Sequence, residues 1–142
     1  IAAMGGVFTY LKELGAQCGL GENASYEDIF KTIHAYEETL TRRMLDGLED
    51  IDSLTLFGIS DRSLLNRRAA TFSFRIEGQT PEQTSEKLCS KGIACRHGHS
   101  YAARLADHMK IGRSGGTLRI SLCHYNTLEE VDRILETIRS IC

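Results

Sequence analysis

Arg119 is the residue whose type and surroundings most clearly indicate binding chemistry. Its neighbours predict a strand, and alternation places the side chains of Leu118 and Ile120 on one side of it. Arg119 then projects from the opposite side, next to the small residues Ser121 and Cys123. A guanidinium group keeps its charge and needs an anionic partner, and small neighbours leave room for its fork to grip a carboxylate. A glutamate on the same open sheet face remains the alternative partner.

A second group of chemically active side chains lies in the segment 96–102. Arg96, His99 and Tyr101 surround a glycine that allows close backbone approach. The segment leads into a predicted helix, and a helix N-terminus favours anions. We expect no metal site, because His97 and His99 lack a third ligand at a suitable spacing. The alternative is a polar loop with solvated histidines.

The turn after the Arg119 strand holds His124, Tyr125 and Asn126. We interpret Asn126 as turn chemistry before a Thr127 N-cap, and leave the roles of His124 and Tyr125 open.

The cysteines are expected to be reduced thiols, as in a cytoplasmic protein, because their number is odd and no CxxC pair occurs. Cys123 is the best placed for nucleophilic use, since it lies near Arg119 and a helix start. We nevertheless predict no catalytic residue in the chain. The cysteines are Cys18, Cys89, Cys95, Cys123 and Cys142.

The pattern of apolar residues predicts an α+β fold: a small, mostly antiparallel sheet with helices on one face, preceded by two N-terminal helices. Gly15 is expected to end the first helix, and Ser25 to cap a second of more than twenty residues. The remaining elements follow in the order strand, strand, helix, strand, helix, strand, helix. They are expected at 54–58, 70–76, 81–90, 93–96, about 100–109, around Arg119, and from Thr127 onward.

Composition excludes several classes of function. The chain has 142 residues and a net charge of -2, so it lacks the positive charge that nucleic acids or anionic membranes would require. It has no apolar run of the roughly 20 residues that span a bilayer. A small-molecule ligand is the better expectation.

The segment from Gly115 to Leu135 resembles the C-terminal part of class V aminotransferases, the group that includes cysteine desulfurases and selenocysteine lyases. Their "R-x-S/G-L-x-x-Y-N-T" strand end corresponds to the segment 119–127, and a helix of "EEVDRLLE" type follows at 129–136. This resemblance implies the C-terminal domain of a fold-type I enzyme that uses pyridoxal phosphate. It also implies that Arg119 binds the α-carboxylate of an amino-acid substrate.

The loop at 96–102 indicates which subgroup of this family the chain resembles most. Desulfurases of one type read "R-x-G-H-H-C" here, and Tyr101 occupies the position of their catalytic cysteine. The segment 98–102 is instead similar to the "G-x-F-Y-A" of a cysteine desulfurase-like subgroup without that cysteine. The resemblance implies that Arg96, His99 and Tyr101 contribute to substrate binding.

The same resemblance implies that much of the enzyme lies outside this chain. Residues 1–48 would be a helical linker to a missing large domain, and 49–142 the small domain. None of the five lysines matches the Schiff-base motif, so we expect pyridoxal phosphate in the parent, none bound by this chain alone, and no turnover by the fragment. They are Lys12, Lys31, Lys87, Lys91 and Lys110.

Relatives of this fold form dimers, so a homodimer is expected. Two alternatives stay open. The chain is a stand-alone binding or assembly module without catalytic activity, or it belongs to a true cysteine desulfurase or selenocysteine lyase that uses another cysteine, such as Cys95 or Cys123.

Overall fold

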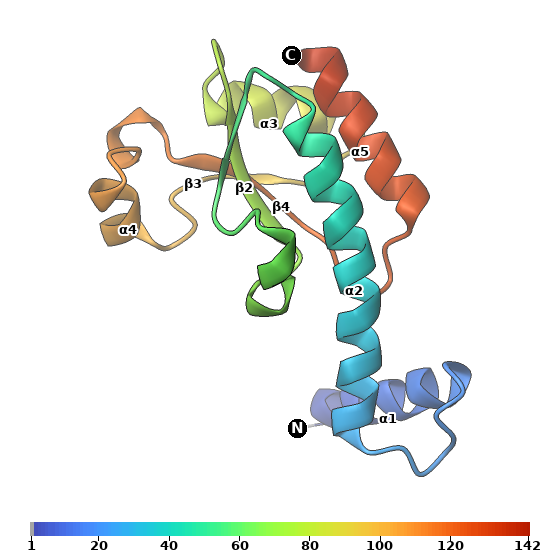
Figure 1. Cartoon of the computed structure of the whole chain (residues 1–142). Helices are drawn as coiled ribbons and strands as arrows, with labels where there is room; N and C mark the ends of the chain where they lie inside the picture. The colour runs from blue at the N-terminus through green and yellow to red at the C-terminus, as the bar shows by residue number, and fades with distance from the viewer. Residues whose placement is uncertain (1) are drawn as a thin grey trace.

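The computed structural model describes residues 2–142, which fold into a four-stranded sheet with helices packed on one face (Figure 1). The predicted α+β class is confirmed. The helices are α1 (Ala2–Gln17), α2 (Tyr26–Glu49), α3 (Pro81–Ser90), α4 (Ala103–His108) and α5 (Leu128–Ile141), with short 3-10 helices at Arg62–Arg67 and Gly112–Ser114. The strands are β1 (Leu54–Phe57), β2 (Thr71–Ile76), β3 (Arg96–Gly98) and β4 (Thr117–Ser121).

The strand order is β1-β2-β4-β3, and all neighbouring pairs are antiparallel. Alternation in β2 buries Phe72 and Phe74 on the helical face, while Ser73 and Arg75 lie half-buried on the other. Helices α2, α3 and α5 cover the apolar face, and α4 lies beyond one end of the sheet (Figure 1). The opposite face therefore stays open around its centre.

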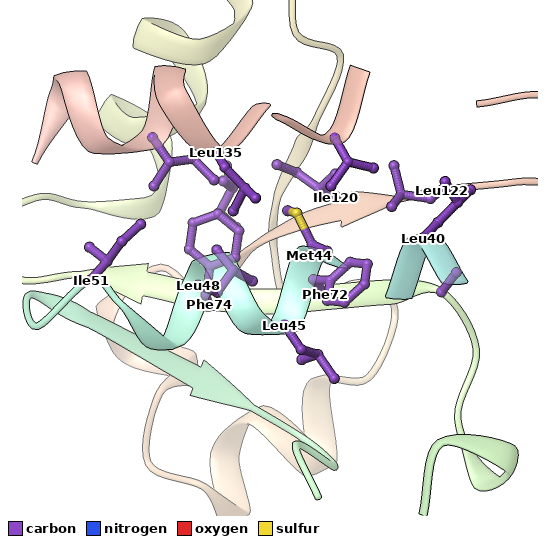
Figure 2. Packing of buried hydrophobic residues seen from close by; sticks show 14 of the residues in the cluster. Leu40, Met44, Leu45, Leu48, Ile51, Phe72, Phe74, Ile120, Leu122 and Leu135 are labelled. Atoms are coloured by element: carbon purple, nitrogen blue, oxygen red, sulfur yellow. The ribbon is translucent and has the colours of Figure 1, made fainter. Parts of the chain in front are cut away.

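The core lies between the sheet and the second half of α2. Met44 and Leu48 of α2 meet Phe72, Phe74 and the α5 residue Leu135 (Figure 2). All five side chains are at most 2% exposed. Burial of side chains of this size contributes about 1.5–3 kcal/mol each, so this layer holds the sheet in place.

Gly15 does not end α1, contrary to the prediction, because the helix continues to Gln17. Gly15 is buried against α2, and a Cβ there would lie 2.7 Å from Cγ1 of Ile29. The glycine therefore serves close packing of α1 on α2 rather than helix termination.

The predicted strand at 93–96 is displaced toward the C-terminus, since pairing begins only at Arg96. The N–H of Ile93 donates to the carbonyl of Leu88 at 3.0 Å, and the N–H of Gly92 donates to that of Cys89 at 2.9 Å. With Gly92 at φ +76°, these bonds form the Schellman motif that ends α3. The backbone of 92–93 is therefore used by the helix and is not free for the sheet.

The helix expected at about 100–109 is shorter, because α4 starts at Ala103. Ser100 and Tyr101 have φ values of +49° and +62°, which a right-handed helix cannot contain. The 3-10 helix at Arg62–Arg67 was not predicted. Asp61 is the N-cap of this 3-10 helix, and its carboxylate accepts a hydrogen bond from the N–H of Ser63.

Candidate functional site

Arg119 projects from the open face of the sheet, as its strand pattern predicts, and its strand β4 is paired on both sides. Its neighbours Leu118 and Ile120 are buried beneath the helices, at 0% and 2% exposure. Across the sheet, Arg119 is directly opposite Ser73 of β2 on one side and Arg96 of β3 on the other. Residues opposite one another in a ladder project to the same face. Ser73, Arg119 and Arg96 therefore form a row across the open face.

The two arginines of this row carry like charges and lack a protein counter-ion. Among residues 2–142, no ion pair or side-chain hydrogen bond includes Arg96 or Arg119. Within these residues, Arg119 therefore has no glutamate partner, which was the alternative interpretation. Two adjacent guanidinium groups without a carboxylate favour a bound anion, and their forked donors match a carboxylate.

Arg75 is a third arginine on this face, but its donors are already used. It donates through Nη1 to Oγ of Ser114 at 2.9 Å and through Nη2 to the Ser114 carbonyl at 3.2 Å. The alternating pattern of 70–76 was enough to predict that Ser73 and Arg75 lie on the open face. It could not predict that β2 is the neighbour of the Arg119 strand, because strand order is not encoded in local alternation.

The loop after β3 is held by a close glycine contact. Gly98 bridges to Gly116, and a Cβ on Gly116 would lie 2.2 Å from the Gly98 carbonyl oxygen. Two consecutive non-glycine residues then adopt left-handed backbone, Ser100 and Tyr101. Each such residue costs on the order of 1 kcal/mol, a strain typical of binding loops.

His99 lines a hollow of about 310 Å³ where α4 borders the open face. Ser73 and Thr117 contribute polar atoms to the same hollow, and Leu105 and Met109 of α4 contribute apolar ones. The structure thus brings His99 close to the row that contains Arg119. The lining of this hollow is mostly apolar with a few polar groups, which suits a small organic molecule.

Tyr101 is 90% exposed and does not line the hollow beside the arginine row. The four residues predicted to bind substrate therefore fall into three positions. Arg96 and Arg119 are adjacent, His99 is at the neighbouring hollow, and Tyr101 is at the loop surface.

Asn126 has the turn role expected of it. Its Oδ1 accepts from the N–H of Cys123 at 2.8 Å, and its Nδ2 donates to Glu130 at 3.1 Å. His124, whose role was left open, contacts the hydroxyl of Tyr10 through Nε2 at 2.6 Å. This contact between α1 and the turn that joins β4 to α5 could not be predicted from the local sequence, because the two residues are far apart in the chain.

The residues of this chain do not fit pyridoxal phosphate by themselves. The cofactor requires a lysine aimed at its ring, whereas Lys31 pairs with Glu27 on α2 and Lys87 donates to Gln79 on the helical side. Lys110 lines a separate hollow with Asp107. Within residues 2–142, no lysine lines the hollow next to the arginine row.

Among residues 2–142, no three His, Cys, Asp or Glu side chains gather closely enough to hold a metal ion. No described helix is both long and apolar enough to cross a bilayer.

Known proteins resemble the chain over most of its length. Residues 13–134 match the aminotransferase class-V family. A probable cysteine desulfurase of Synechocystis is 30% identical over 138 residues, which cover 97% of this chain and 28% of that protein. An aminotransferase-like protein of Gibberella zeae is 30% identical over 124 residues, covering 85% of this chain and 30% of its own.

Solved structures agree with this assignment. The apo cysteine desulfurase of Thermococcus onnurineus superimposes with a TM-score of 0.70 at 27% identity, over 82% of this chain and 28% of that one. The chain thus spans less than a third of the length of these relatives. It belongs to the aminotransferase class-V family, whose members are pyridoxal-phosphate-dependent transferases and lyases, and corresponds to a fragment of such an enzyme.

Proposed function

We propose that this chain forms the substrate-carboxylate side of the active site in a pyridoxal-phosphate enzyme that acts on an amino acid. Arg119 grips the α-carboxylate, and Arg96 supplies a second positive charge from the adjacent strand. The observation that carries the proposal is the pair of opposed arginines without a carboxylate partner in residues 2–142.

The sheet explains why Arg119 suits this role. It lies on a strand paired on both sides, over buried Leu118 and Ile120, so its backbone is fixed before a ligand arrives. A charged hydrogen bond from a preorganised fork contributes about 1.5–3 kcal/mol. Its function is to orient the substrate, and orientation serves catalysis by removing unproductive poses.

His99 and Tyr101 belong at the entrance of this site. His99 borders the hollow beside the arginine row, and Tyr101 lies on the strained, exposed loop, where we expect the large domain of the parent to meet it. In this proposal Tyr101 replaces the nucleophilic cysteine of desulfurases. Cysteine desulfuration is then not the reaction of the parent enzyme by the usual route.

The alternative desulfurase, which would use another cysteine, is favoured only by the names of the relatives. Cys95 is a poor candidate for it. Alternation places Arg96 on the open face, so the preceding Cys95 faces the helices and contacts Ser85 of α3 at 3.5 Å. Burial raises the pKa of the Cys95 thiol, which disfavours the nucleophilic thiolate.

The remaining parts of the proposal concern the parent protein. Residues 1–48 link a large, cofactor-binding domain to the small domain 49–142, and the parent is a homodimer in the cytoplasm. The second half of α2 nevertheless packs in the core of the small domain, through Met44 and Leu48. The linker is therefore also a structural part of the domain that it joins.

The test compares three arginine-to-lysine variants in the full-length parent. Arg119→Lys and Arg96→Lys keep the charge but lose the fork, so kcat/KM for an accepted amino acid falls about tenfold or more. Arg75→Lys is the matched control, because its donors are held by Ser114. Equal effects in all three variants would contradict the proposal.

A further inference from the structure

Two thiols lie in contact on the helical side of β3. Sγ of Cys89, near the end of α3, is 3.9 Å from Sγ of Cys95. The hydroxyl of the buried Ser85 lies 3.5 Å from the Cys95 sulfur and 4.0 Å from the Cys89 sulfur. Among residues 2–142, no other two cysteine sulfurs make such a contact.

The end of α3 creates this proximity. Gly92 reverses the chain in left-handed backbone, and the Schellman bonds direct Ile93 into the core. The chain then runs back along α3 before β3 begins at Arg96. Because Arg96 faces the open side, Cys95 faces α3 and meets Cys89 there.

The two thiols differ in access to solvent. Cys89 is exposed, whereas Cys95 is half-buried and packs against the core. Desolvation raises the pKa of the Cys95 thiol, and the Ser85 hydroxyl opposes this effect by hydrogen bonding to the sulfur. An oxidant in solution therefore reaches Cys89 first, and Cys95 is positioned to react with the product.

We propose that Cys89 and Cys95 are a site of reversible oxidation, in which hydrogen peroxide converts the two thiols into one disulfide. A disulfide has an S–S length of about 2.05 Å, so the sulfurs must approach by roughly 2 Å. Rotation of the exposed Cys89 side chain can supply this movement.

The chemistry balances in two steps. The Cys89 sulfur attacks one peroxide oxygen, the O–O bond breaks, and Cys89 becomes a sulfenic acid with release of one water. The Cys95 thiol then gives up its proton as its sulfur attacks the Cys89 sulfur, the S–O bond breaks, and the leaving hydroxide takes that proton to form a second water. The two sulfurs lose two electrons in total, which reduce the two peroxide oxygens.

The disulfide fastens the start of the edge strand β3 to α3. Arg96 follows Cys95 directly and pairs with Arg119, so oxidation fixes the backbone on which the arginine row depends. The thiol site itself does not require the proposed carboxylate function, since it lies on the opposite face of the sheet.

The test uses the whole chain, reduced and then treated with a small excess of hydrogen peroxide. Remaining thiols are alkylated, and the protein is digested with trypsin. Cleavage at Lys91 separates the peptides 88–91 and 92–96, so the disulfide appears as these two peptides joined, less two hydrogen atoms. We expect this product to dominate and to disappear on treatment with dithiothreitol.

Single variants test each sulfur. Cys89→Ser and Cys95→Ser each abolish the joined peptide, and dimedone traps a sulfenic acid on Cys89 in the Cys95→Ser variant. Cys123→Ser is the matched control and leaves the joined peptide unchanged. Circular dichroism confirms that all variants are folded.

Two results would overturn the proposal. In one, Cys89 and Cys95 pair with Cys18, Cys123 or Cys142 as often as with each other. In the other, the joined peptide forms equally fast in concentrated urea, which would mean that short sequence separation and not the folded turn brings the sulfurs together.

Discussion

Arg119 illustrates how far one residue can be interpreted from its strand. Its neighbours were enough to predict which side it faces, because Leu118 and Ile120 must be buried. Its pairing with Arg96 was not predictable, since β3 begins three residues later than the expected strand at 93–96. The register therefore added the most informative fact about the site, a like-charged neighbour.

Removing Arg96 should stabilise the fold while weakening the site. Like charges opposite each other in a sheet cost about 0.2–1 kcal/mol, and exposure of Arg96 places the effect near the lower end. Arg96→Gln is thus expected to raise the free energy of unfolding by a few tenths of a kcal/mol. Urea denaturation measures it, with Arg104→Gln as control, because Arg104 is exposed on α4 and has no opposed arginine in the sheet. A clear loss of stability in Arg96→Gln would contradict the like-charge interpretation.

Gly116 is expected to tolerate no side chain. Its φ of +74° disfavours L-residues, and a Cβ would meet the backbone of Gly98, which cannot rotate away. Gly116→Ala should therefore lower the free energy of unfolding by more than about 1 kcal/mol. Gly58→Ala is the control, because its φ is also positive but its Cβ would enter open space. Equal losses of unfolding free energy in both variants would show that the Gly98 contact is unimportant.

At the scale of elements, helix ends were predicted best where the capping residues lie within a few positions of the helix end. Helix α3 has its predicted bounds, and α5 begins after the predicted capping box of Thr127 and Glu130. The predictions were wrong where tertiary packing decides, as at Gly15, which contacts Ile29, and at Ser100 and Tyr101, whose left-handed backbone delays α4. Such positions depend on neighbours distant in sequence.

The capping box of α5 should make stability depend on pH in the acid range. Hydrogen bonds from the Asn126 amide and the Thr127 N–H lower the pKa of Glu130 below its ordinary value. A carboxyl whose pKa is lower in the folded state stabilises the fold above its unfolded pKa, about 4.3, and loses this effect as pH falls through the folded pKa.

Urea denaturation of the wild type and Glu130→Gln between pH 7 and roughly pH 2 measures this contribution. The difference in unfolding free energy between the two should shrink as pH falls through that window. Glu136→Gln, a change of equal charge on the exposed side of α5, is the control. A difference that stays constant with pH would contradict the proposed role of Glu130.

At the scale of the whole molecule, α1 and the start of α2 form an incompletely covered region. Large apolar side chains there are strongly exposed, among them Met4 at 66%, Val7 at 55%, Phe8 at 49% and Phe30 at 54%. In Figure 1, α1 crosses the first turns of α2 away from the helices that cover the sheet. Such a surface is typical of a region that contacts another protein body.

The isolated chain is therefore expected to self-associate through these two helices. Phe8→Glu places a charge in the exposed apolar region, and sedimentation velocity should then show a shift toward monomer. Tyr101→Ser is the control, because it removes an aromatic side chain of even greater exposure from a distant loop. Monomers at every concentration in the wild type would contradict this expectation.

The central claim is that Arg119 binds the substrate carboxylate. It is tested in the full-length parent by comparing wild type with Arg119→Ala for two ligands. The measured quantity is the dissociation constant, read from cofactor absorbance, for an amino acid and for the amine that lacks its carboxylate. We predict that Arg119→Ala weakens binding of the amino acid by roughly tenfold to a hundredfold, and leaves binding of the amine unchanged. Equal changes for the two ligands, or no change for either, would contradict the account.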